Sequence, residues 1–111
     1  MFPAKTRLGR ADFTQFFKTG RRFQTAALTL VYLPSPTLHV SVVVGKKVSK
    51  LAVGRNRIRR RLYAGLRRFF EANGITSGVY IIIAKPVAVR YSRVELASEL
   101  TTLLALPQKP R

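Results

Sequence analysis

The most informative run for the architecture is Val79-Tyr80-Ile81-Ile82-Ile83-Ala84, which is almost continuously apolar and is followed by Lys85-Pro86. A strand with one face in water alternates apolar and polar residues, and this run does not alternate. It is also too short for an ordinary helix. The pattern therefore predicts a central strand that is covered on both faces and ends at Pro86.

Two earlier segments supply candidate partner strands. Phe23 to Leu33 is rich in β-branched and apolar residues and stops at Pro34-Ser35-Pro36, so we predict one strand there with an interruption near Thr25. In the segment from Leu38 to Val44, three valines alternate with other residues: Val40, Val42 and Val44. This alternation predicts the next strand of a hairpin.

Three segments have helical signals. Asp12 followed by Gln15 is typical of a capping box and predicts a short helix that stops before Gly20. From Arg55 to about Asn73 the period is helical, with an apolar stripe of Ile58, Leu62, Leu66 and Phe69 or Phe70, and Gly74 is a natural stop.

A last helix is predicted over residues 92–104. Ser92 is the expected N-cap and Glu95 stands at the capping-box position, with four inward-facing leucines: Leu96, Leu100, Leu103 and Leu104. The order helix, two or three strands, helix, strand, helix predicts an α+β two-layer sandwich with helices packed on one sheet. We expect one domain over residues 1–111, with a basic lead-in to about residue 10 and a frayed tail from 107.

The charge balance points to a polyanionic partner. The chain has 21 Lys and Arg against four acids, Asp12, Glu71, Glu95 and Glu99, and a net charge of +17. Self-repulsion of this size opposes compaction unless counter-charge is supplied. A membrane surface is the weaker candidate, because the basic helix has only a narrow apolar stripe. Met1 to Arg10 lacks the apolar segment of a secretory signal, so a cytoplasmic location is expected.

The basic residues concentrate between Lys46 and Arg61, where five arginines fall within the seven residues 55–61. No acid occurs between Asp12 and Glu71, whereas a solvated helix face usually mixes signs for i, i+4 pairing. Guanidinium groups bind phosphate oxygens bidentately and stack on bases. The run therefore favours a nucleic-acid surface over an ordinary solvated face.

Residues for independent catalysis are hard to assemble. The four carboxylates are scattered, His39 has no nucleophile partner in the pattern, and there is no cysteine for a thiol nucleophile, a disulfide or a thiolate zinc site. We predict no catalytic residue and no metal site on this chain. If the protein takes part in catalysis, another molecule supplies the reactive groups.

The aromatic residues of the first helix have two interpretations. Phe13, Phe16 and Phe17 share one side of it, as core residues do. Alternatively, some of the rings stack on unpaired bases in a groove beside the sheet, while Lys18 and its neighbours hold the backbone. Both can hold at once.

These residues together resemble the bacterial ribonuclease P protein family. The resemblance rests on Arg55-Asn56-Arg57 with Ile58-Arg59-Arg60, on Ala52-Val53 and Lys46-Lys47 before them, and on Arg7-Leu8, Asp12 to Lys18 and Tyr80 to Pro86 in the same order. It implies a mixed sheet in which the arginine-rich helix joins two parallel strands by a left-handed crossover, an exception to the usual rule.

The resemblance also implies roles for individual residues. Contacts with the catalytic RNA subunit would come from Arg55, Asn56, Arg57, Arg59, Arg60, Arg61, Lys46 and Lys47. Phe13, Phe17 and Lys18 would line or flank a cleft for the single-stranded 5′ leader of precursor tRNA. The RNA with Mg²⁺ would perform the hydrolysis, and the protein, expected as a monomer in a 1:1 complex, would hold no cofactor tightly.

The chain departs from the family pattern at several positions. Tyr63 and Ala64 stand where the family often has a basic residue and an acid, and Gly45 replaces a usual serine. Val31 takes the place of a cleft-side aromatic, and Tyr32, one position along, would face the other way.

Other functions compete with this interpretation. A ribosomal or ribosome-assembly protein is the first alternative. A DNA-binding module and a metal-dependent nuclease acting alone are weaker.

Overall fold

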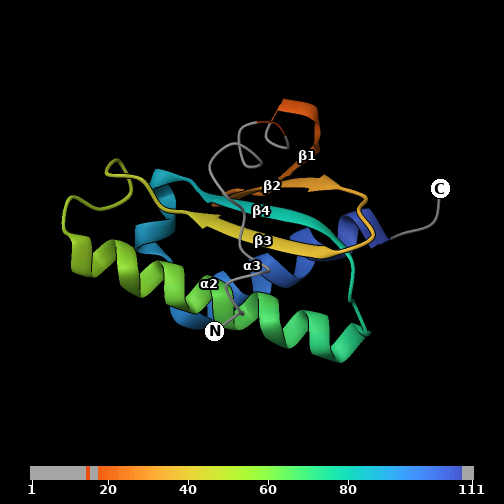
Figure 1. The fold of residues 1–111 in the computed structure, drawn as a ribbon. Helices are drawn as coiled ribbons and strands as arrows, with labels where there is room; N and C mark the ends of the chain where they lie inside the picture. Colours follow the sequence, from red (N-terminus) through yellow and green to blue (C-terminus); the bar gives the residue numbers. More distant parts are fainter. Residues whose placement is uncertain (1–14, 16–17, 109–111) are drawn as a thin grey trace.

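Four strands form one sheet in the described part of the computed structural model, which comprises residue 15 and residues 18–108. The strands are β1 (Arg21–Gln24), β2 (Leu28–Leu33), β3 (Leu38–Val43) and β4 (Gly78–Ala84), in the spatial order β1-β2-β4-β3. Helices α2 (Ala52–Asn73) and α3 (Arg93–Ala105) both pack on one face of this sheet (Figure 1), with the 3₁₀ segments η2 (Pro86–Arg90) and η3 (Leu106–Gln108) flanking α3. The predicted α+β two-layer sandwich is confirmed.

β4 is the central strand, as its apolar run predicted. It pairs antiparallel with β2 and parallel with β3, and Ile81 and Ile82 are fully buried. The prediction that β3 forms a hairpin with β2 is wrong, because β4 lies between them. A strand buried on both faces needs a hydrogen-bonding neighbour on each edge. The connection from β2 to β3 therefore crosses the start of β4, where the Gly78 N–H donates to the Thr37 carbonyl (3.1 Å).

The segment predicted as one strand over Phe23–Leu33 is two antiparallel strands, β1 and β2, with the break at Thr25 as predicted. The Thr25 N–H donates to the Leu28 carbonyl (2.9 Å), which closes the turn. Glu99 of α3 accepts hydrogen bonds from the Thr25 hydroxyl and from the Ala27 N–H (2.5 Å). The turn is thus tied to the helix layer.

The apolar stripes of both helices are confirmed. Those of α2 and α3 are buried in the same core: Ile58, Leu62, Leu66, Phe70, Leu96, Leu100, Leu103 and Leu104. Helix α2 starts at Ala52, three residues before the predicted start, with Leu51 as an N-cap that makes no side-chain bond, and it ends at Gly74 with φ 63°. The predicted capping box of Ser92 and Glu95 is present.

Val31 and Tyr32 of β2 lie on opposite faces of the sheet, as the sequence predicted. Val31 clusters with Val79 and Ile81 on the face away from α2 and α3. Tyr32 packs towards the helices, with its ring 5.1 Å from that of Tyr80. A role for Tyr32 on the Val31 face is therefore excluded.

α2 connects the parallel strands β3 and β4, which is the crossover unit that the family resemblance implies. Its handedness stays a prediction. Of the first predicted helix, the described residues Gln15, Lys18 and Thr19 are helical and the chain bends at Gly20, while Asp12, Phe13, Phe16 and Phe17 lie outside the described residues. Among the helices described, none has the length and apolar character needed to cross a membrane.

Candidate RNA interface

The exposed surface of α2 is formed mainly by arginines that point away from the core. Arg57, Arg61 and Arg68 are four and seven residues apart and lie along the edge of α2 next to α3. Arg59 lies on the other edge, beside Asn56 and Tyr63, and Arg60 borders both edges. The buried stripe of α2 thus fixes a broad cationic surface on its outer side.

Arg55 has a different position from the other arginines. Its Nη1 donates to the carbonyl oxygens of Ser49 (3.0 Å) and Lys50 (2.9 Å), and its side chain is only half-exposed. These bonds hold the connection from β3 to α2, which carries the exposed Lys46 and Lys47. The structure therefore gives Arg55 a role in shaping this connection, which the sequence did not predict.

Asn56 and Arg59 lie one helical turn apart and contact each other. The Arg59 Nη1 donates to the Asn56 Oδ1 (2.6 Å), and both side chains are on the outer side of the helix. A hydrogen bond of this kind restricts the guanidinium to fewer orientations. Asn56 is thus placed to orient Arg59 towards a ligand.

The described carboxylates leave most of this surface without counter-charge. Glu71 pairs with Arg67 (3.1 Å) in an exposed i, i+4 bridge of small stabilising effect. Glu95 caps α3, and hydrogen bonds from Ser92 hold its pKa below the ordinary value. Within the described residues, no hydrogen bond or ion pair engages the side chains of Arg57, Arg60, Arg61, Arg68 and Arg93.

Glu99 is the remaining described acid, and it serves the fold. Partial burial acts to raise its pKa, but hydrogen bonds from Thr25, Ala27 and Tyr91 and the charge of Lys85 outweigh burial, so the net pKa is lowered. The Lys85 Nζ donates to the Thr25 carbonyl (2.7 Å), which closes the cluster around the β1–β2 turn. The Glu99 carboxylate therefore bonds to groups around the β1–β2 turn and does not neutralise the arginines of α2.

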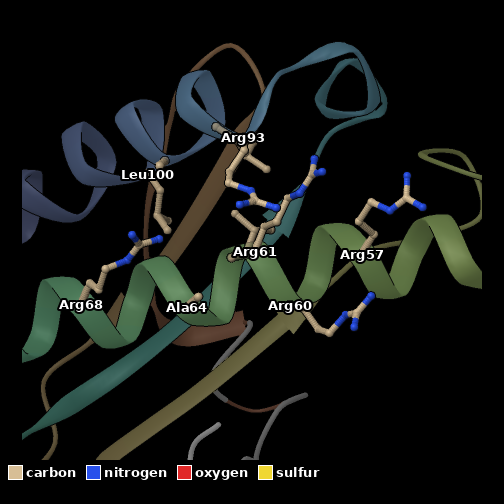
Figure 2. Close-up of a pocket in the computed structure, with 10 residues that line it drawn as sticks. Arg57, Arg60, Arg61, Ala64, Arg68, Arg93 and Leu100 are labelled. Carbon is tan, nitrogen blue, oxygen red and sulfur yellow. The ribbon is translucent and has the colours of Figure 1, made fainter.

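A groove of about 420 Å³ lies between α2 and α3. Figure 2 shows Arg61 and Arg93 directed into the space between the two helices, with Arg68 and Leu100 farther along it. Sequence reasoning missed Arg93, because it is 32 positions from Arg61 and only the packing of α3 on α2 brings them together. Arg68 can be found from the sequence, because it and Arg67 are the basic residues able to substitute for the contact that Tyr63 replaces, and Arg68 continues the spacing of Arg57 and Arg61.

The predicted leader cleft lies mostly outside the described residues. Phe13 and Phe17 are not among them, and Lys18 is exposed at the end of the short helix. Arg22 pairs across the sheet with Val31 and so lies on the face away from α2 and α3. The structure thus places Arg22 on that face, and the exposed Lys18 precedes β1 by three residues. No three His, Cys, Asp or Glu side chains lie close enough to hold a metal ion in the described ranges.

Comparisons with known proteins agree with this arrangement. The family model described as Ribonuclease P matches residues 2–107. The ribonuclease P protein component of Xylella fastidiosa is 34% identical over 115 residues, with 98% of this chain and 84% of the relative covered. That of a Pseudanabaena species is 36% identical over 110 residues, with 95% and 93% covered.

Solved structures support the fold. The RNase P protein of Staphylococcus aureus matches with a TM-score of 0.75 at 18% identity, covering 93% of this chain and 95% of that one. The RNase P protein of Thermotoga maritima matches with a TM-score of 0.72 at 22% identity, covering 87% and 94%. The sequence matches over nearly the whole length show that the chain belongs to the ribonuclease P protein family and is a protein component of the ribonuclease P holoenzyme of tRNA processing.

Proposed function

We propose that this chain binds the catalytic RNA of ribonuclease P through the arginine surface of α2 and the 5′ leader of precursor tRNA on the other face of the sheet. The RNA with Mg²⁺ hydrolyses the phosphodiester bond that frees the mature tRNA 5′ end. The protein contributes affinity and orientation as a monomer in a 1:1 complex with the RNA.

The observation that carries the RNA-binding proposal is the uncompensated charge on α2. Its arginines project from a helix whose other side is buried in the core, so they are held at fixed spacing instead of moving with a loop. Phosphates along an RNA strand can supply the negative charge that acidic side chains do not provide here. Each guanidinium offers a planar set of hydrogen-bond donors to a phosphate. Asn56 and the exposed pair Lys46 and Lys47 extend the same surface.

The leader proposal is supported by the opposite face of the sheet. Arg22 lies on this face, directly opposite Val31 in the β1–β2 register, and the exposed Lys18 precedes β1 by three residues. A single-stranded leader offers phosphates for cations and unpaired bases for apolar or aromatic side chains. Phe17→Ala and Lys18→Ala should therefore weaken binding of precursor tRNA more than binding of mature tRNA. Equal effects on both substrates would contradict the leader assignment.

The first test is cleavage of precursor tRNA by a bacterial ribonuclease P RNA at low Mg²⁺, with and without this protein. Strong stimulation with the correct 5′ end is expected. Without stimulation, tight and unselective RNA binding would favour a ribosomal role instead.

A second test addresses α2 itself. Replacing Arg57, Arg59 and Arg60 by Gln should lower the slope of log K against log salt by about one unit for each lost phosphate contact. Arg21→Gln and Arg90→Gln, exposed arginines outside α2, are the matched controls. A slope equal to that of the controls would mean that RNA binds elsewhere.

A further inference from the structure

The groove between α2 and α3 is lined by both cationic and apolar side chains. Five arginines that we call its rim line it, Arg57, Arg60, Arg61, Arg68 and Arg93, together with five apolar residues that we call its floor, Leu62, Ala64, Leu96, Ala97 and Leu100. No acid lines it. The groove therefore has cations for a phosphate and an apolar floor for an uncharged ring.

Its cations come from two helices. Arg57, Arg61 and Arg68 follow one edge of α2, and Arg93 approaches from the first turn of α3 (Figure 2). Packing these like charges around one hollow is unfavourable without an anion between them. In the described part of the chain, none of these side chains is engaged by a carboxylate. The arrangement is hence suited to an anion that contacts both helices.

The size of the groove narrows the class of ligand. About 420 Å³ is within the range of roughly 300–1,000 Å³ usual for small-molecule sites and far exceeds the needs of an inorganic anion. A duplex cannot enter such a hollow, but one nucleotide with its base turned out of the stack can. The apolar floor would receive the base while the rim holds its phosphates.

We propose that the α2–α3 groove binds one unstacked nucleotide of the RNA partner, and that Arg93 is an RNA-contacting residue outside the arginine-rich helix. This inference rests on the proposed function, since it requires an RNA on the α2 surface. It adds a pocket of defined shape to the cationic surface of α2. It also makes α3 part of the interface.

Two pairs of variants test the pocket in binding assays with a bacterial ribonuclease P RNA. Arg93→Gln removes one rim cation, and its control, Arg90→Gln, removes an exposed arginine in η2 that does not line the groove. Arg93→Gln should weaken binding about tenfold relative to that control and lower the salt slope by about one unit.

The second pair tests the floor without changing any charge. Ala97→Leu fills the groove, whereas Ala72→Leu adds the same group to an exposed position of α2 outside it. Ala97→Leu should weaken binding by about tenfold, because a base then loses roughly 60 Å² of apolar burial. Its salt slope should stay close to that of Ala72→Leu. Melting curves of all four variants in the same buffer identify any loss of folding.

The outcomes separate this inference from the proposed function. If the unaltered protein neither binds the RNA tightly nor stimulates cleavage, the proposed function fails. If it does both and Arg93→Gln equals Arg90→Gln, only the pocket is refuted. If Arg93→Gln is weakened but Ala97→Leu equals Ala72→Leu, the groove offers charge to a backbone phosphate and holds no base, which overturns the nucleotide assignment.

Discussion

Gly65 lies where α2 crosses α3, and its replacement by Ala tests how closely the two helices pack. A Cβ atom at this position would stand 2.6 Å from Cδ2 of Leu100. Leu100 is only 1% exposed, so its methyl group can move only by repacking against its buried neighbours or by turning into the groove that it lines. The close approach of the two helices, and with it the shape of the groove, therefore depends on glycine.

Two opposing effects determine how much Gly65→Ala changes the free energy of unfolding. Ala is favoured over Gly by about 1 kcal/mol in a helix interior. Overpacking a filled core costs about 1–3 kcal/mol. We expect the packing cost to win for Gly65→Ala, with a net loss of about 1 kcal/mol and a fall in Tm of about 4–8 °C.

The decisive measurement is a double-mutant cycle by urea or thermal unfolding. Leu100→Ala removes the atom that Cβ would strike, at a cost of about 2–5 kcal/mol by itself. In that background Gly65→Ala should become stabilising by about 1 kcal/mol, since only the helix preference remains. Leu104→Ala, a buried leucine one turn along α3, is the matched control and should not reverse the sign. If Gly65→Ala stabilises the unaltered protein by its full helix preference, Gly65 and Leu100 do not pack this closely.

Three further predictions concern the folded state. Ser92→Ala should lower stability by about 1 kcal/mol through loss of the α3 N-cap, whereas Ser98→Ala on the exposed side of α3 should change it far less, as denaturant unfolding can show. The pKa of Glu99 is lowered in the folded protein, so its ionised form stabilises the fold above the ordinary pKa of 4.5, and this stabilisation is lost as pH falls through the folded pKa. The difference in unfolding free energy between the unaltered protein and Glu99→Gln should therefore shrink in that acid range. A difference that does not depend on pH would refute this. Sulfate at tens of millimolar should raise Tm by occupying the arginine surface, and an unchanged Tm would count against a built anion site.

Most of the fold could be predicted because its signals are local. The period of Ile58, Leu62 and Leu66 fixes the buried side of α2, and the capping residues Ser92 and Glu95 fix the start of α3. Gly74 marks the end of α2 because it adopts a left-handed conformation there. These patterns depend on residues within a few positions of each other.

The strand order could not be predicted in the same way, because it depends on contacts between distant segments. The alternation of Val40, Val42 and Val44 predicts a strand with one buried face, but it does not identify the neighbouring strand. The apolar run of β4 already implied a central position. Combined with the need of such a strand for partners on both edges, it could have placed β4 between β2 and β3.

The candidate site shows the same limit. The charge run from Arg55 to Arg61 can be recognised in the sequence, but the sequence does not show that its arginines have different roles. Arg55 instead hydrogen-bonds two carbonyls of the preceding connection, and Arg59 is oriented by Asn56. Arg93 joins the surface only through tertiary packing.

Under the proposed function, binding and folding should be coupled, because α2 would serve both. The leucines that anchor α2 to the sheet hold its arginines at fixed positions, so the core determines the spacing of the charges. In return, an anion on the arginine surface relieves the repulsion that opposes the packing of α2 against α3. A ligand that binds only the folded state stabilises it by mass action. RNA binding should therefore stabilise the α2–α3 contact itself, and weakening that contact at Gly65 should weaken RNA binding although Gly65 carries no charge.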